Sequence, residues 1–361
     1  MRIAVLSNIF EELSNRKEVE NDLALVGKSV MDALKHYGHD VVFFDANERV
    51  FEKLRRSNID FVFNVCERWN GNSFFEPHVA AMLELLGIPY TGSGPLTLSL
   101  CMNKVRVKEI LMHHGIPTPN YQLFYSRNKK LDPDLKFPLI VKPVCMDNSI
   151  GITNDSVVKN EEELRSKVGY IIRTYSQPAL VEEFIDGREF TIGLLGNNKP
   201  LILPIIEINF QKYPEGANKI LSYESKWHKD SSLYDDCEDV CPADIPKYIE
   251  ARVKKVALEV YELLDLKDYG RIDIRLSSDG IPYVLEMNPN PGISSEIFSD
   301  NSAEISDYND YLPKAAAAIG VSYKELIYRI FSHALERYGM FEQLQTIKTE
   351  TPFAEVVEKI A

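Results

Sequence analysis

The chain has 361 residues and a formal net charge of -13, with 45% hydrophobic residues and five cysteines. This length predicts two or three domains, and the composition excludes global disorder and a disulfide framework. The acidic balance argues against nucleic acid and anionic membranes as main partners, and because no apolar stretch approaches the ~20 residues of a membrane helix, we expect a soluble, cytoplasmic protein.

The first hundred residues alternate strand and helix patterns. We expect strands at residues 3–6, 40–44, 61–65 and 88–90, and helices at 19–37 and 77–86. This alternation predicts a parallel sheet with helices on both faces. Because ligands of such sheets bind at the carboxyl ends of the strands, the loops after Leu6, Val65 and Tyr90 are the predicted substrate-facing segments.

The pattern changes at about residue 100. A helix at 103–114 is followed by strands at 121–125, 139–142 and 179–184, with a helix at 161–174. Further strands are expected at 190–195, 201–207, 271–276 and 283–286, and helices at 245–264 and 323–338. We therefore divide the chain into a first domain (1–100), two α+β subdomains (101–187 and 188–339) and a charged tail (340–361).

One hairpin gathers oxygen ligands. The two strands around the turn at 277–280 carry Asp273 on the first, and Glu286 and Asn288 on the second. Glu286 and Asn288 are two residues apart and so share a face, and pairing of the strands would bring Asp273 beside them. Three hard oxygen ligands, with room for waters and phosphate, suit Mg²⁺ on a nucleotide.

Six segments in chain order resemble the ATP-grasp superfamily, most closely the D-alanine–D-alanine ligases, over residues 60–335. They are GIPYTGSG at 87–94, MNKVRVK at 102–108, PLIVKP at 138–143, EEFIDGREFT at 182–191, ESKW at 224–227, and the hairpin with its EMNPNPG end at 286–292. Each motif alone is weak, whereas six in order are strong.

The resemblance implies an α/β ATP-grasp fold, in which an N-terminal parallel α/β domain is followed by two α+β subdomains that enclose ATP. It further implies an ATP-dependent carboxylate–amine ligase that works through an acyl phosphate. The implied cofactors are ATP and two Mg²⁺, with Mn²⁺ as a substitute. The implied partners are small-molecule carboxylate and amino-acid substrates, and a homodimer is expected from the family alone.

The nucleotide-binding residues are implied by the same motifs. Lys104 and Lys142 would contact the phosphates, and Lys226 the γ-phosphate. Adenine would lie against residues 182–185, and the ribose hydroxyls against Glu189. The full predicted nucleotide set is Lys104, Lys142, Glu182, Glu183, Phe184, Ile185, Glu189 and Lys226.

The catalytic residues implied are Ser149 in the lid over the transferred phosphate, Lys226, and Arg271 with the amide of Gly292 at the oxyanion. Two departures concern the acceptor half of the site. Asn148 stands where the family has the first lid serine, and Trp227 where it has a tyrosine.

The remaining substrate contacts stay open. The family's serine for the second substrate falls near Ile297, so Ser294 or Ser295 would have to substitute. Either Glu18 or Glu20 could be the glutamate that seats the first substrate.

Simpler interpretations remain open. The lysines could be solvated charges, residues 184 and 185 could be ordinary core, and Arg271 could merely pair with Asp273 or Glu286. The alternative function is a non-ligating ATP-binding sensor or subunit that kept the fold. The retained lysines and metal acids argue against that alternative, and D-alanyl-D-alanine is only one candidate product.

Overall fold

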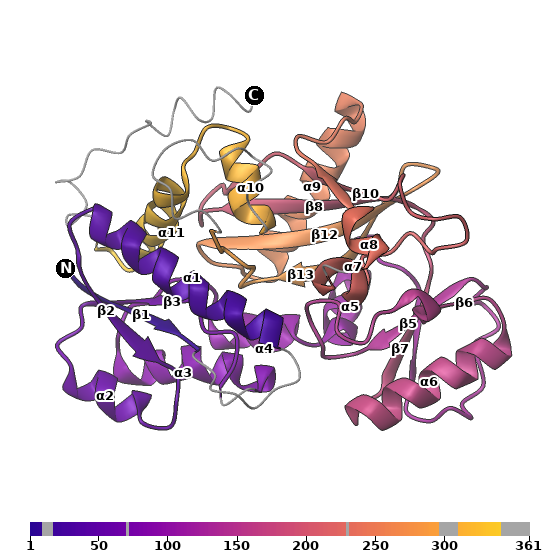
Figure 1. Ribbon diagram of the computed structural model, residues 1–361, viewed down its shortest axis with the longest axis horizontal. Helices are drawn as coiled ribbons and strands as arrows, with labels where there is room; N and C mark the ends of the chain where they lie inside the picture. The colour runs from indigo at the N-terminus through magenta and orange to yellow at the C-terminus, as the bar shows by residue number, and fades with distance from the viewer. Residues whose placement is uncertain (9–16, 70–71, 229–230, 296–309, 341–361) are drawn as a thin grey trace.

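The computed structural model describes residues 1–8, 17–69, 72–228, 231–295 and 310–340, without the side chains of 17–25, 232 and 235. Three sheets run from one end of the molecule to the other (Figure 1). The predicted tail lies outside the described residues, apart from Met340. No described helix is both long enough and apolar enough to cross a membrane.

The first sheet is parallel, as the sequence predicted, with strand order β2-β1-β3. Its elements are β1 (Arg2–Ser7), α1 (Lys17–His36), β2 (Asp40–Asp45), α2 (Val50–Arg56), β3 (Phe61–Asn64), a 3-10 turn (Ser73–Phe75), α3 (Glu76–Leu86) and α4 (Pro95–Cys101). Successive side chains of β1 face opposite sides. Ile3 and Val5 pack with α1, whereas Ala4 and Leu6 pack with α2 and α3, so helices cover both faces.

One expectation for this region is wrong, and two short helices were missed. The strand expected at 88–90 is reduced to a single parallel bridge between Tyr90 and Val62. The helices α2 and α4 were not predicted, because seven residues are too few for a clear helical period.

The second sheet is antiparallel with strand order β4-β7-β5-β6. Its elements are α5 (Lys104–His113), β4 (Tyr121–Phe124), β5 (Leu139–Pro143), a 3-10 turn (Asn154–Ser156), β6 (Val157–Val158), α6 (Glu161–Tyr175) and β7 (Ala179–Glu183). The side chain of Asn103 caps α5 by accepting a hydrogen bond from the Arg106 amide at 3.2 Å. Helix α6 packs on β5, β6 and β7.

The third sheet has the path β11-β10-β8-β12-β13, with β9 paired to β8. Its strands are β8 (Gly187–Leu195), β9 (Leu201–Ile202), β10 (Ile206–Asn209), β11 (Glu238–Val240), β12 (Tyr269–Ser277) and β13 (Pro282–Asn288). Its helices are α7 (Tyr223–Trp227), α8 (Ser232–Asp235), α9 (Lys247–Leu263), α10 (Tyr311–Ala317) and α11 (Tyr323–Arg337). The single strand expected at 201–207 is wrong: it is split in two around Pro204, which has no N–H to donate to a ladder.

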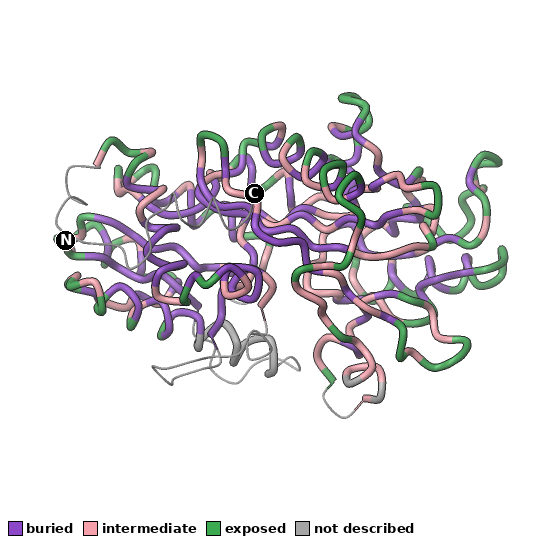
Figure 2. The backbone as a smooth tube through the Cα atoms, turned by 90° about the horizontal axis from the view of Figure 1, so that it is seen from above, coloured by how far each residue is buried: buried purple, intermediate pink, exposed green. Residues whose placement is uncertain are grey.

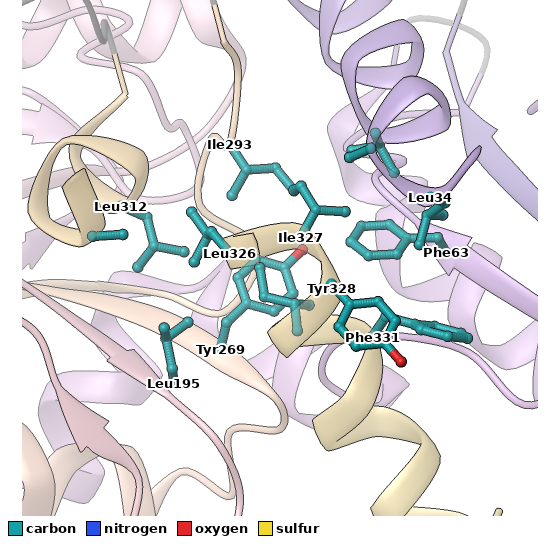
Figure 3. Packing of buried hydrophobic residues seen from close by; sticks show 14 of the residues in the cluster. Leu34, Phe63, Leu195, Tyr269, Ile293, Leu312, Leu326, Ile327, Tyr328 and Phe331 are labelled. Carbon is teal, nitrogen blue, oxygen red and sulfur yellow. The ribbon is translucent and has the colours of Figure 1, made fainter. Parts of the chain in front are cut away.

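Helix α11 belongs to the core of the first domain as much as to the third sheet. It lies beside α1 (Figure 1), far from it in sequence. Figure 3 shows Ile327 and Phe331 of α11 near Leu34 and Phe63 of the first domain, while Leu312 of α10 continues the same cluster. Figure 2 shows buried residues, in purple, continuing from the region around the N-terminus into the middle of the molecule, in line with this single cluster.

Acid should destabilise the packing of α11 on the first domain, because His39 lies at this contact. The imidazole lies against the rings of Tyr328 and Phe331 of α11, with centroids 6.4 and 5.2 Å away. Burial and the positive N-terminus lower the pKa of His39 from 6.5 to about 4. Between these two pH values His39 is protonated in the unfolded chain but neutral in the folded chain. The free energy of unfolding therefore falls as the pH falls.

Urea unfolding of the wild type and of His39→Gln, at about pH 7 and about pH 4.5, measures this effect. We expect the variant to lose less of its unfolding free energy between the two pH values than the wild type. An equal loss in both proteins would show that His39 does not drive the acid sensitivity.

Candidate active site

A cavity lies where the second and third sheets meet, with side chains from β5, β7, β8, β12 and β13 in its lining. The rest of the lining comes from the segments 148–152, 184–185 and 220–221, from Ile208 of β10, Lys226 of α7 and Tyr311 of α10. Among the residues predicted from the sequence, the cavity brings together Lys142, Ser149, Glu182, Phe184, Ile185, Glu189, Lys226, Arg271, Asp273 and Glu286. The predicted residues outside this lining are Lys104, Glu183, Asn288 and Gly292.

The β12–β13 hairpin has the predicted geometry. Asp273 pairs in register with Glu286, and Arg271 with Asn288. On the other side of β12, Asp273 faces Thr191 of β8, whose hydroxyl donates a hydrogen bond of 2.6 Å to Asp273 Oδ1. Because alternate residues of a strand share one face, β12 and β13 present their polar side chains together to the cavity.

Asp273 and Glu286 each have a cationic neighbour. Arg271 forms a two-pronged pair with Asp273, with both nitrogen–oxygen distances at 3.0 Å. Burial alone would lower the pKa of Arg271, but the charge of Asp273 raises it above its ordinary value. Lys104 Nζ lies 3.3 Å from Glu286 Oε1. The arrangement matches the simpler interpretation of Arg271 as a partner of Asp273, and Arg271 also lines the cavity.

The ligand chemistry of the hairpin fits a hard divalent cation. In the described part of the chain, no group of three His, Cys, Asp or Glu side chains stands at metal-binding spacing. The predicted set instead joins the carboxylates of Asp273 and Glu286 to the amide oxygen of Asn288. That oxygen accepts a hydrogen bond of 3.0 Å from the Asn290 amide, which orients it. An all-oxygen set with two negative charges suits Mg²⁺.

A buried row of three charges stands opposite the hairpin. Glu182 on β7 lies between Lys142 on β5, with which it forms an ion pair, and Lys108 on α5, whose Nζ is 2.7 Å from Glu182 Oε1. Burial would raise the pKa of Glu182, but the two ammonium groups lower it. Burial lowers the pKa of Lys108 to about 8 in spite of Glu182. The ion pair with Glu182 thus holds the Lys142 side chain in the lining of the cavity.

Lys104, the first residue of α5, contacts the hairpin through Glu286. Its ammonium donates to the Met146 carbonyl at 2.7 Å, besides its contact with Glu286. Burial would lower the pKa of Lys104, but the carboxylates of Glu286 and Asp147 raise it. The anions that hold this cation at the start of α5 are therefore protein carboxylates.

The segment around Ser149 is joined to α7. Trp227 Nε1 donates to the Asn148 carbonyl at 3.1 Å, and Lys226 Nζ lies 3.1 Å from Asn148 Oδ1. The hydroxyl of Ser149 donates to the Leu221 carbonyl at 2.8 Å. Asn148 has a φ of 55°, a left-handed conformation that asparagine adopts more readily than most residues. The two sequence departures, Asn148 and Trp227, therefore touch each other.

Gly292 lies next to Asp310, the residue that precedes α10. A Cβ at Gly292 would lie 2.3 Å from Asp310 Oδ1, so a larger residue there would displace the Asp310 carboxylate. Asp310 also accepts hydrogen bonds from the amide and hydroxyl of Ser294, at 2.6 and 2.7 Å. Ser294, one of the expected substitutes for the family serine, is thus already bonded within the protein. The side chains of Glu18 and Glu20, and the whole of Ile297, lie outside the described residues.

Comparison with known proteins identifies this arrangement. A sequence model described as "D-ala D-ala ligase C-terminus" matches residues 110–332. A D-alanine–D-alanine ligase of Bordetella petrii is 35% identical over 323 residues, which cover 88% of this chain and 89% of that protein. The chain belongs to the D-alanine–D-alanine ligase family.

Other relatives extend the comparison. An uncharacterized protein of Sinorhizobium fredii is 33% identical over 321 residues, covering 87% of this chain and 88% of that protein. The crystal structure of a D-alanine–D-alanine ligase from Bacillus anthracis complexed with ATP is similar with a TM-score of 0.71 and 26% identity, over 94% of this chain and 99% of that chain. The comparisons confirm the predicted ATP-grasp fold and the predicted class of enzyme, an ATP-dependent ligase.

Sequence reasoning missed two buried cations of the site, Lys108 and Arg275. Lys108 is four residues after Lys104, hence on the same helical face, and this spacing was the available signal. Arg275 continues the alternation of Arg271 and Asp273 along β12, and its register partner is Glu189. Both lie within segments that carry the family motifs, but neither was assigned a role.

Proposed function

We propose that this member of the D-alanine–D-alanine ligase family joins a small carboxylate to the amine of an amino acid, with ATP as the source of energy. The carrying observation is that one cavity holds the Lys142–Glu182 pair on one side and the Arg271, Asp273 and Glu286 hairpin on the other. Phosphoryl transfer depends mainly on positioning and on neutralising charge, and these two groups supply both.

The proposed reaction has two displacements. A carboxylate oxygen of the first substrate attacks the γ-phosphorus of ATP, the bond to the bridging oxygen breaks, and ADP leaves. The amine of the second substrate then attacks the acyl carbon, the carbon–oxygen bond to phosphate breaks, and the amine loses a proton. No protein nucleophile is needed.

The chain's residues divide this work. Lys142 and Lys226 would hold the phosphates, with residues 182–185 and Glu189 at the nucleoside. Partial burial and the charge of Arg271 lower the pKa of Lys226. Asp273, Glu286 and Asn288 would hold two Mg²⁺, which neutralise phosphate charge when bound. Arg271 would stabilise the oxyanion, a contribution commonly of about 10²–10³ in rate.

The setting of the enzyme follows from these substrates. Because ATP and free amino acids are its reactants, we place it in the cytoplasm, and the family suggests a homodimer. We also propose the division into residues 1–100, 101–187 and 188–339, supported by the change of sheet near Gly187.

Phosphate and ADP release, measured with no amine and then with pools of amines and carboxylates, tests the proposal. We expect release that depends on both substrates, with the amide product detected by mass spectrometry. Nucleotide binding without release in any pool would favour the non-ligating sensor. No nucleotide binding at all would contradict both functions.

Lys142→Ala should weaken ATP binding by roughly 1.5–3 kcal/mol, because a charge-assisted contact to phosphate is lost. Calorimetry with a non-hydrolysable ATP analogue measures the change. Lys136→Ala is the matched control, because Lys136 is exposed and its ammonium bonds the nearby Pro133 carbonyl, away from the cavity. An unchanged dissociation constant in Lys142→Ala would make Lys142 a structural residue.

A further inference from the structure

Arg275 is a buried cation in the lining of the cavity, two residues beyond Asp273 on β12. Only 3% of its surface is exposed. The guanidinium lies over the rings of Phe184 and Phe210, with 5.5 and 5.6 Å to their centroids. A cation at this depth is stable only if an anion and further acceptors satisfy it.

The anion is Glu189. The two residues face each other across β12 and β8, and Arg275 Nη2 pairs with Glu189 Oε2. The same nitrogen donates to the Lys219 carbonyl at 2.7 Å, and Nη1 lies 3.4 Å from the Ile185 carbonyl. One side chain therefore joins β8, the segment after β7 and the segment that leads to α7.

We propose that Arg275 is a positioning residue that fixes the Glu189 carboxylate for the ribose hydroxyls, and that it thereby makes the site selective for ribonucleotides over 2′-deoxyribonucleotides. This inference rests on the proposed nucleotide role of Glu189. With Oε2 held by Arg275, Oε1 is the oxygen that accepts a hydroxyl. A glutamate that is already held gives up less conformational freedom when the nucleotide binds.

Arginine is required for this role. Its planar fork donates to several acceptors at fixed angles while its faces stack on aromatic rings. A lysine would keep the charge, but its single ammonium cannot reach Glu189, Ile185 and Lys219 in the same geometry. Arg275→Lys therefore separates positioning from charge.

Calorimetry with ADP and with 2′-deoxy-ADP, each with Mg²⁺, tests the proposal. We expect the wild type to bind ADP about tenfold more tightly, since the 2′-hydroxyl donates to a charged acceptor. Arg275→Met should lose most of this preference by binding ADP about tenfold more weakly, with 2′-deoxy-ADP little changed. Glu189→Gln should do the same, and the double variant should lose no more.

Arg252→Met is the matched control, because Arg252 also donates to a backbone carbonyl, that of Gly280 in the turn of the same hairpin, but is exposed and away from the cavity. It should keep the preference. If Arg275→Met does not fold, Arg275→Lys carries the test with the same expected loss.

Three results would overturn the proposal: no preference in the wild type, a preference that survives in the Arg275 variants, or equal weakening of both nucleotides. Binding requires no ligation. A wild type that shows the preference but joins no substrates would therefore contradict the proposed reaction while supporting the role of Arg275.

Discussion

Asp273→Asn is expected to lower phosphate release from ATP by more than about a hundredfold while the fold stays intact. Mutation of a residue that only hydrogen-bonds to a metal ligand typically lowers metal affinity or activity by about 10–100-fold, and loss of a ligand itself should cost more. The asparagine would keep an oxygen for the Thr191 hydroxyl, which donates to Asp273 Oδ1 at 2.6 Å. It would lose the negative charge that a divalent cation needs. Steady-state release across a magnesium titration measures the effect.

Asp279→Asn is the matched control for this variant. Asp279 is an exposed residue in the turn of the same hairpin, where it pairs with the Ser277 hydroxyl. The control should turn over like the wild type. Near-normal turnover of Asp273→Asn at saturating magnesium would remove Asp273 from the metal site.

D-alanine alone should be a poor substrate, with a kcat/KM below the ~10⁴ M⁻¹s⁻¹ of ordinary enzymes, and a larger or differently charged carboxylate should be preferred. Where the family has a serine and a tyrosine, this chain has Asn148 and Trp227. The Trp227 N–H is already used on the Asn148 carbonyl, at 3.1 Å. Tryptophan is larger and has no phenolic hydroxyl, so a small D-amino acid would leave the polar groups of this pocket poorly satisfied.

Substrate screening by phosphate release measures this preference. Since Asn148 and Trp227 are in contact, Asn148→Ser and Trp227→Tyr should act together, and the double variant should use D-alanine better than the separate effects predict. Formation of D-alanyl-D-alanine by the wild type at ~10⁴ M⁻¹s⁻¹ or above would refute our interpretation of the two departures.

The sequence was most informative where a local period determines the contact. The alternation within residues 271–288 predicts which side chains share a face, and the register of Asp273 with Glu286 agrees. Lys108 was missed because its partner, Glu182, belongs to a distant strand, and no local pattern predicts which strand packs behind a helix. Arg275 lies in the predicted hairpin but was given no role, because its partner, Glu189, belongs to the separate strand β8.

Helix α11 is another case in which a local pattern does not predict the distant partner. Its amphipathic pattern predicts that one face is buried, but not that this face lies against α1 and β3 of the first domain. Likewise, the strand expected at 201–207 follows from its apolar run, while the break at Pro204 depends on hydrogen-bond needs that a hydrophobic pattern does not express.

The packing of α11 on the first domain also bears on how the protein is made. Ile3 and Val5 leave the ribosome early, yet their cluster is completed by side chains of α11 near residue 330. At roughly 5–20 residues per second, synthesis of the intervening chain takes on the order of 15–60 s. During that time α1 covers this face of the first sheet only in part, and the apolar side chains that α11 later covers stay exposed to water.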